Sequence, residues 1–142
     1  MPFPLTPSQE RTLGLESHLS VTANAGSGKT TVLARRFVEI FKKTDAPLNS
    51  VVAVTFTEQA AGELRKKIHE VILACEEDPS GDPSLRSRLR DVRNQLPSAL
   101  IGTIHSFCAR ILRMYPAEAD IDASFSVLQG QDRSRLVTES VA

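Results

Sequence analysis

The residues whose types and spacing could do chemistry gather in one glycine-containing segment, Ala23–Thr30. Gly26 and Gly28 allow backbone torsions and a close approach to a ligand that a Cβ would prevent. Successive backbone N–H groups in such a loop form a concave anion site, and a helix that begins behind it adds partial positive charge. Lys29 would reach the β- and γ-phosphates of a nucleotide, and the Thr30 hydroxyl would coordinate Mg²⁺. The segment therefore predicts a phosphate-binding loop for ATP, with Lys29 and Thr30 as catalytic residues.

A phosphate loop needs a strand before it and a helix after it, and the sequence predicts both. The apolar run Leu19–Ala23 predicts a short strand. Apolar residues then recur at helical spacing, which predicts a helix from about Lys29 to Lys43. The general pattern of phosphate loops begins with Gly where this chain has Ala23. Because Ala is small, we expect a slightly different start of the loop and no loss of binding.

A short helix is predicted near the N-terminus, ahead of the loop. Thr6 can cap it, Pro7 suits its first position, and Gln9 completes a capping box. The helix is expected to end at about Leu15.

Strand and helix patterns alternate after the loop. The β-branched run Val51–Phe56 predicts a strand covered on both faces, and Ala99–Thr103 predicts another strand. Helices are expected over Thr57–Cys75, Leu85–Leu96 and Ser106–Met114. This alternation predicts an α/β fold with a parallel sheet and right-handed crossovers.

Two further segments stand where a predicted strand passes into a helix: Thr55–Leu64 and Gly102–Cys108. Ligands of open α/β sheets bind at this carboxyl edge of the sheet. Thr57 and Ser106, together with the N–H groups of a helix start, can hold DNA phosphates. Phe56 and His105 offer faces on which a base can stack.

Several of these residues also have purely structural interpretations. Gln9 could serve only the capping box. Phe56 could belong to the core as the last residue of a buried strand, and His105 could be structural. The four arginines between positions 86 and 93 are interpreted as a solvated helix face, with a contact to the DNA backbone as the alternative.

The order of these segments resembles the superfamily 1 DNA helicases of the UvrD/Rep type, over about Leu5–Leu128. Four blocks carry the resemblance: Leu5–Gln9, Ala23–Thr30, Thr55–Leu64 and Thr103–Leu112. Glu58, where many relatives have Asn, and Phe107-Cys108 after the serine resemble the RecB/AddA branch, the motor subunits of recombination helicase–nucleases. Many relatives have Lys at the position of Gln59, so that phosphate contact is not carried over.

The resemblance implies a RecA-like P-loop NTPase fold, with a parallel sheet and flanking helices that are incomplete in this chain. Residues 1–115 would form the N-terminal part of the ATP-binding domain, and residues 116–142 would begin a helical insertion subdomain. Gln9 would read the adenine edge of ATP. The implied nucleotide-binding residues are Gln9, Ala23, Asn24, Ala25, Gly26, Ser27, Gly28, Lys29, Thr30 and Thr31. Mg²⁺ would bind Thr30, and the implied DNA-binding residues are Phe56, Thr57, His105 and Ser106.

The implied function is that of an ATP-dependent DNA helicase that moves 3′ to 5′ along DNA in repair or recombination. Its cofactors would be ATP and Mg²⁺. Its partners would be single-stranded DNA, the ends of DNA duplexes and, for the RecB/AddA branch, a partner subunit with nuclease activity. We expect a cytoplasmic location, with no membrane contact.

One part of such an ATPase is not identified: a strand that ends in an Asp-Glu pair. The only apolar run that ends in acids, Val71–Asp78, continues the helical period from Ala61 and is interpreted as a helix end. An arginine finger and a second RecA-like domain are not identified either. We therefore expect the chain to stop within a domain, and to bind Mg·ATP weakly with little or no turnover.

Two other function classes are weighed against the helicase motor. The first is a non-catalytic fragment that binds nucleotide or single-stranded DNA without hydrolysis. The second is a small P-loop kinase or another NTPase; a kinase would need an acceptor pocket and a lid with phosphate-binding arginines. A kinase gives no reason for the two strand-to-helix segments.

Composition narrows the partners only slightly. Seventeen basic residues balance seventeen acidic ones, so a nucleic-acid site must be a local patch. No apolar run approaches the roughly 20 residues that a membrane span needs, and the N-terminus lacks the pattern of a secretory signal. Cys75 and Cys108 form no metal-binding spacing and are expected to be reduced thiols.

Overall fold

The computed structural model of the chain describes residues 4–24, 26–79 and 81–127. These residues form helices and a parallel sheet, so the α/β class is confirmed. They fall into two compact units that divide between Thr103 and Ile104, and each unit is described by itself. Within the described ranges, no helix is both long and apolar enough to cross a membrane.

The first helix, α1, spans Pro7–Arg11 and ends earlier than the predicted Leu15. Its capping box is present as predicted. The Thr6 hydroxyl accepts a hydrogen bond from the backbone N–H of Gln9 at 3.3 Å, and the Gln9 side chain accepts one from the N–H of Thr6 at 2.9 Å. Just beyond the helix, the carbonyls of Thr12 and Gly14 accept hydrogen bonds from the guanidinium of Arg36.

The strand predicted at Leu19–Ala23 is absent from the structure, and this segment has no regular secondary structure. A strand needs a neighbour that completes its backbone hydrogen bonds. Among the described residues the sheet consists of β1 (Val52–Thr55) and β2 (Leu100–Thr103), and neither pairs with this segment. Leu19 and Val21 are exposed as a result, at 46% and 56%.

Helix α2 spans Lys29–Lys43, as the helical spacing predicted. Ala34, Phe37, Val38 and Phe41 are buried on one face of it, and the rings of Phe37 and Phe41 lie 5.3 Å apart. Lys42 and Lys43 lie in its last turn, where cations interact favourably with the helix dipole.

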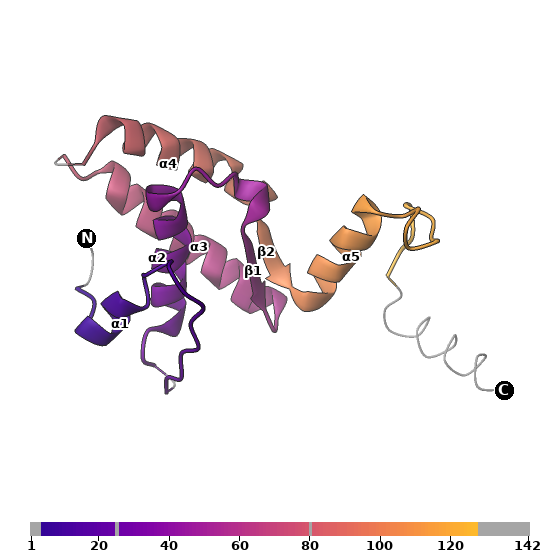
Figure 1. Cartoon of the computed structure of the whole chain (residues 1–142), viewed down its shortest axis with the longest axis horizontal. Coiled ribbons are helices and arrows are strands. Elements are labelled where there is room, and N and C mark those ends of the chain that lie inside the picture. Colours follow the sequence, from indigo (N-terminus) through magenta and orange to yellow (C-terminus); the bar gives the residue numbers. More distant parts are fainter. Residues whose placement is uncertain (1–3, 25, 80, 128–142) are drawn as a thin grey trace. The chain divides into compact units, whose positions relative to one another are not determined.

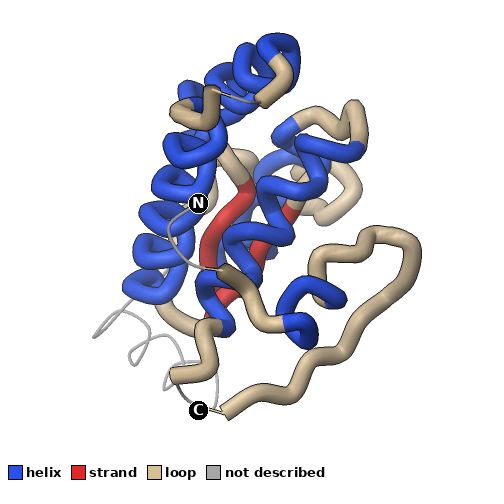
Figure 2. Tube along the Cα trace, turned by 90° about the vertical axis from the view of Figure 1, so that its left-hand side faces the viewer, coloured by secondary structure: helices blue, strands red, loops and turns tan. Residues whose placement is uncertain are grey.

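The two strands of the sheet, β1 and β2, run parallel. Figure 2 shows them side by side in red between the helices. In register, Ala53 lies opposite Ile101, and both are buried. Val52 and Val54, on the other face of β1, are 41% and 44% exposed. The prediction of a strand covered on both faces is therefore wrong for the described residues, because they cover only one face.

Helix α3 (Glu58–Glu76) is the centre of this unit and contacts α2, α4 (Pro83–Gln95) and both strands (Figure 1). The largest fully buried side chains belong to these helices: Val38, Phe41, Leu64, Ile68, Ile72 and Leu89. Because α3 continues to Glu76, the interpretation of Val71–Asp78 as a helix end is confirmed.

Helix α4 is followed by a 3-10 turn, Leu96–Ser98. The arginine series on α4 is more than a solvated face. Arg88 binds Asp45 at 2.5 Å, and the Nε of Arg93 lies 3.2 Å from a carboxylate oxygen of Glu76. These two pairs link α4 to the segment after α2 and to the end of α3.

The second unit contains helix α5, Ile104–Met114, which begins two residues before the predicted Ser106. After it, the guanidinium of Arg113 lies 4.7 Å from the ring centre of Phe125. Residues 128–142 lie outside the described residues, so the predicted helical subdomain over 116–142 is described only in its first part.

Candidate nucleotide-binding site

The loop between Asn24 and Lys29 has the backbone conformation that its glycines predict. Gly26 and Gly28 have φ values of 76° and 77°, a region that side chains with a Cβ rarely adopt. A Cβ on Gly26 would meet no atom within 4 Å, so its torsion and not crowding requires glycine there. Ala25, which the sequence places in the same loop, lies outside the described residues.

The N-terminus of α2 is open, in contrast to the starts of α1, α3 and α4. Each of those three helices is capped by a side chain: Thr6, Thr57 or Asp82. Helix α2 has Gly28 as its N-cap and no side-chain cap, and its first intrahelical bond joins the N–H of Val32 to the Gly28 carbonyl at 3.0 Å. The N–H groups of the preceding residues of this turn therefore have no helical partner. They suit an anion, which the helix dipole also favours.

Lys29 folds back over the loop. Its Nζ donates to the carbonyls of Ala23 at 2.9 Å and Asn24 at 2.6 Å. These acceptors are neutral and exposed, whereas phosphate oxygens form charge-assisted bonds with an ammonium group that are roughly twice as strong. The side chain is thus held at the loop and can transfer its hydrogen bonds to an anion there.

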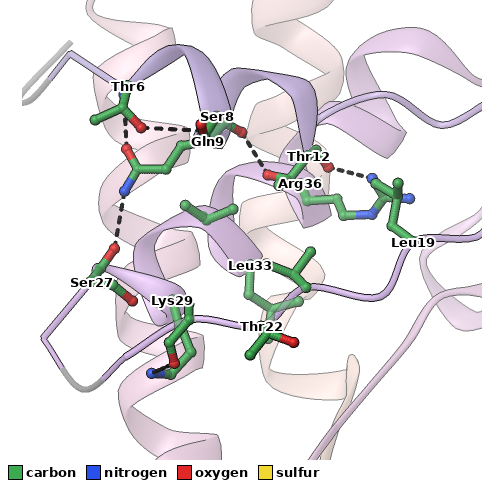
Figure 3. Close-up of a pocket in the computed structure, with 13 residues that line it drawn as sticks. Thr6, Ser8, Gln9, Thr12, Leu19, Thr22, Ser27, Lys29, Leu33 and Arg36 are labelled. Carbon is green, nitrogen blue, oxygen red and sulfur yellow. Dashed lines mark hydrogen bonds between the residues drawn. The ribbon is translucent and has the colours of Figure 1, made fainter.

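Gln9 joins α1 to the loop (Figure 3). Its Nε2 donates to the carbonyl of Ser27 at 3.0 Å, while its Oε1 accepts from the N–H of Thr6. A flipped amide would lose both bonds, so the network fixes which end is oxygen. The structure therefore places Gln9 against the loop, as well as in the capping box.

A pocket of about 660 Å³ lies between α1, residues 19–23 and α2. This volume falls within the range of about 300–1,000 Å³ that small-molecule sites occupy. Helix α2 contributes residues spaced three and four apart, Lys29, Val32, Leu33 and Arg36. The remaining lining residues are Thr6, Ser8, Gln9, Thr12, Leu19, Val21, Thr22, Ala23 and Ser27. An apolar wall with polar groups at the loop end can hold a flat base and its phosphates.

Thr30 and Thr31 follow Lys29 in the first turn of α2, with Thr30 exposed and Thr31 half-buried. The structure thus brings the predicted nucleotide-binding residues into one region, apart from Ala25, which it does not describe. Among the described residues, no group of three or more His, Cys, Asp or Glu side chains could hold a metal ion.

Arg36 is a residue of this region that sequence reasoning did not assign to the site. Its Nη1 donates to the carbonyl of Thr12 and, at 2.5 Å, to that of Gly14. The signal in the sequence was its spacing, since Arg36 lies seven residues after Lys29 and so on the same helix face.

The end of β1 carries two of the predicted DNA-binding residues. Phe56 is fully exposed, with a relative accessibility of 102%, so the interpretation as a core residue is wrong. The Thr57 hydroxyl accepts a hydrogen bond from the N–H of Ala60 at 3.1 Å and caps α3 as predicted. A hydroxyl that accepts in this way keeps its proton available for another acceptor.

The end of β2 is joined to the first residue of α3 by a bond that sequence reasoning did not predict. The Thr103 hydroxyl donates to Oε1 of Glu58 at 2.9 Å. The parallel register, in which Thr55 lies opposite Thr103, could have shown that these segments meet. His105 and Ser106 are exposed at the start of α5 in the second unit, so they are not placed relative to the loop.

The comparison with known proteins fits this arrangement. Residues 5–142 match the family model of the UvrD/REP helicase N-terminal domain. The chain is also similar to one of the subunits of the ATP-dependent helicase/nuclease from three bacteria. It is 34% identical to the protein of Limosilactobacillus reuteri over 140 residues, 40% to that of Desulforudis audaxviator over 139, and 42% to that of Natranaerobius thermophilus over 118.

These alignments cover 98%, 96% and 81% of the chain but only 10%, 11% and 9% of the relatives. The chain thus spans about a tenth of the length of the curated relatives it matches. The resemblance found in the sequence, including its RecB/AddA-like character, is confirmed. Because the family model matches nearly the whole chain, the chain belongs to the UvrD/REP helicase N-terminal domain family.

Proposed function

We propose that this chain is the ATP-binding motor portion of an ATP-dependent DNA helicase, built on a RecA-like P-loop fold. Residues 1–115 would belong to the ATP-binding domain and residues 116–142 to a helical subdomain. The observation that carries the proposal is the uncapped start of α2, which follows two glycines of positive φ and carries Lys29. These features together form an anion site of the kind that binds nucleotide phosphates.

The hydrogen bonds of Gln9 support adenine as the base. An amide oxygen can accept two hydrogen bonds, and an amide nitrogen can donate two. Thr6 and Ser27 use one position at each end, which leaves one acceptor and one donor. Adenine presents a donor at N6 and an acceptor at N7, and so complements this pair. Guanine presents two acceptors at the corresponding edge and does not.

Mg²⁺ would accompany the nucleotide. The residues of the loop fit a nucleotide-bound Mg²⁺. The phosphates can approach the backbone at Gly26, and the hydroxyl of Thr30 is exposed at the start of α2. Mg²⁺ prefers oxygen ligands and usually takes few from the protein when phosphates are present. Bound there, the ion would neutralise the charge of the β- and γ-phosphates.

Single-stranded DNA is the proposed second ligand. Phe56 presents an uncovered ring at the carboxyl end of β1, and the Thr57 hydroxyl beside it can donate to a phosphate. His105 and Ser106 are proposed to contribute from the start of α5. For the complete protein we propose movement from 3′ to 5′, a role in repair or recombination, a cytoplasmic location and a partner subunit with nuclease activity. The names of the relatives support the helicase and nuclease parts of this proposal.

A second candidate function is nucleotide or DNA binding without hydrolysis by this chain. The observation that favours it concerns the strands. Within the described ranges, β1 ends at Thr55 and β2 at Thr103, so neither ends in the Asp-Glu pair that a motor ATPase uses. Steady hydrolysis of ATP that single-stranded DNA stimulates, measured on the purified 142-residue chain, would contradict this candidate.

The proposed function is tested by titrating a fluorescent ATP analogue with Mg²⁺ into the chain, with and without a short single-stranded oligonucleotide. We expect saturable binding that Lys29→Ala weakens about tenfold or more, since an ammonium–phosphate bond is lost. Lys66→Ala is the matched control, because Lys66 is an exposed lysine on α3. A change in nucleotide affinity when the oligonucleotide is added would show that nucleotide binding and DNA binding are coupled. Absence of nucleotide binding by a folded chain would refute the proposal.

A further inference from the structure

Helix α1 carries Gln9 but cannot hold itself in place. It has five residues and none of them is buried. An isolated helix of this length is not stable in water, because a single turn fixes several torsions for few hydrogen bonds. Contacts outside the helix must therefore determine where the amide of Gln9 lies. The structure provides two of them, at Ser27 and at Arg36.

The contact at Arg36 reaches Gln9 through Thr12. The N–H of Thr12 donates to the Gln9 carbonyl at 3.1 Å, and the Thr12 hydroxyl donates to the same carbonyl at 2.6 Å. The carbonyl of Thr12 in turn accepts from Nη1 of Arg36, which also binds the Gly14 carbonyl. Figure 3 shows this side chain reaching from α2 to Thr12. The end of α1 is thus held by a charged donor, and charge-assisted bonds are stronger than neutral ones.

Helix α2 connects this contact to the phosphate loop. Lys29 and Arg36 are seven residues apart, so they lie on one face of the helix, about 10.5 Å apart along its axis at about 1.5 Å per residue. Both line the same pocket, with Gln9 on its other side. The bond from Gln9 to Ser27 completes a closed path, because Ser27 lies directly before Gly28, the N-cap of α2. Helix α2 is rigid. It therefore fixes the distance between Lys29, which would bind the phosphates, and Arg36, which holds the end of α1 that carries Gln9.

We propose that Arg36 is a positioning residue that fixes Gln9 and thereby sets the preference of the site for adenine. The inference rests on the proposed function, in which Gln9 reads adenine. Arg36 does not itself contact the nucleotide in this scheme. Loss of the Arg36 donors leaves the phosphate loop intact but releases α1. The amide of Gln9 then no longer holds its donor and acceptor opposite N7 and N6 of the base. The preference for ATP over GTP decreases, while affinity for phosphate groups alone stays the same.

The test measures three Mg²⁺-bound ligands by competition with a fluorescent ATP analogue: ATP, GTP and inorganic tripolyphosphate, which has no base. Arg36→Met keeps the unbranched stem of the side chain and removes its donors. We expect the ratio of ATP to GTP affinity to fall about tenfold, within the range for loss of a two-bond contact to one base. Tripolyphosphate affinity should not change. Arg36→Lys restores a charged donor and should recover part of the ratio. Arg90→Met, at an exposed arginine of α4, is the matched control.

Other results overturn the inference. If folded Arg36→Met keeps the ATP-to-GTP ratio, or if all three ligands weaken by the same factor, Arg36 has no part in base selection. If Arg36→Met does not fold by thermal melting, Arg36→Gln decides, because its shorter polar side chain ends before the position of the guanidinium nitrogens and so loses the bonds to the carbonyls of Thr12 and Gly14. An unchanged ratio in that variant refutes the proposal. Absence of Mg·ATP binding by the unmodified folded chain refutes the proposed function, and this inference with it.

Discussion

Replacing Gln9 by Glu separates the structural role of this residue from its proposed role in reading the base. The two side chains have nearly the same shape. A carboxylate still accepts the N–H of Thr6, so the capping box remains, and a negative charge in the first turn of a helix is favourable by roughly 0.3–1 kcal/mol. The bond to the Ser27 carbonyl is lost, at a cost of about 0.5–1.5 kcal/mol. The opposing effects predict a change in unfolding free energy below about 1 kcal/mol.

The effect on nucleotide binding should be much larger than the effect on stability. Glu cannot donate to N7 of adenine, and a bidentate base contact provides about 1–3 kcal/mol of discrimination. ATP affinity should therefore fall about 5- to 150-fold. The added charge also repels phosphates, and tripolyphosphate measures that part separately because it has no base. The adenine-specific loss is the factor by which the decrease for ATP exceeds the decrease for tripolyphosphate.

The assay is calorimetric titration of both ligands with Mg²⁺ into the unmodified chain, Gln9→Glu and Gln9→Ala, with urea unfolding of each protein. Gln9→Ala loses the capping-box acceptor as well, so it should be less stable than Gln9→Glu. Because it adds no charge, it should lose the adenine-specific part of the ATP affinity and leave the affinity for tripolyphosphate nearly unchanged. Equal losses for ATP and tripolyphosphate in Gln9→Glu would show that charge alone acts. In that case Gln9 would serve only the cap and the loop, and its proposed base-reading role would be refuted.

Three further predictions concern other parts of the first unit. Phe56→Ala should lower affinity for a short single-stranded oligonucleotide about tenfold, since base stacking contributes about 1–3 kcal/mol, and should leave thermal stability unchanged because Phe56 is exposed. Ile72→Ala should lower the unfolding free energy by about 2–5 kcal/mol in urea titration, because Ile72 is fully buried; Val52→Ala, at an exposed position, should cost clearly less. The side-chain and backbone hydrogen bonds from Ser84 hold the pKa of Asp82 below its usual value. The charged cap therefore stabilises the fold above about pH 4 and is lost as pH falls through the folded-state pKa, so Asp82→Asn should flatten the decline in stability below about pH 4.

The helices of this chain could be predicted because their signals are local. The spacing of apolar residues located α2 and α3 to within one or two residues, and Thr6 and Thr57 fixed two helix starts. The strand at Leu19–Ala23 could not be decided in the same way. Its sequence has the right composition, but a strand exists only beside another strand, and composition does not provide the neighbour. The exposure of Val52 and Val54 has the same origin, because burial of a sheet face depends on what packs against it.

The candidate site also has one part that local sequence signals predict and another part that they do not. The glycine loop is contiguous in sequence, so residue types and order were sufficient to predict the torsions of its glycines and the helix that follows it. The contacts that organise its surroundings are not contiguous. Gln9 and Ser27 are 18 residues apart, Thr12 and Arg36 are 24 apart, and Glu58 and Thr103 are 45 apart. No pattern of propensity or period encodes such pairs, and only the folded arrangement of α1, α2 and the strand ends reveals them.

The sequence allowed both a structural and a functional interpretation for Phe56 and for Gln9, and the structure distinguishes the two cases. For Phe56 the interpretations exclude each other, because a ring cannot be in the core and also available to a base; its full exposure decides the matter. For Gln9 they do not, because an amide has four hydrogen-bonding positions and the cap and the loop occupy two. The structural bonds of Gln9 are then a condition for base reading, since they hold the other two positions in place. Removing the contact from Arg36 tests this directly, because it disturbs the position of the amide without changing the amide itself.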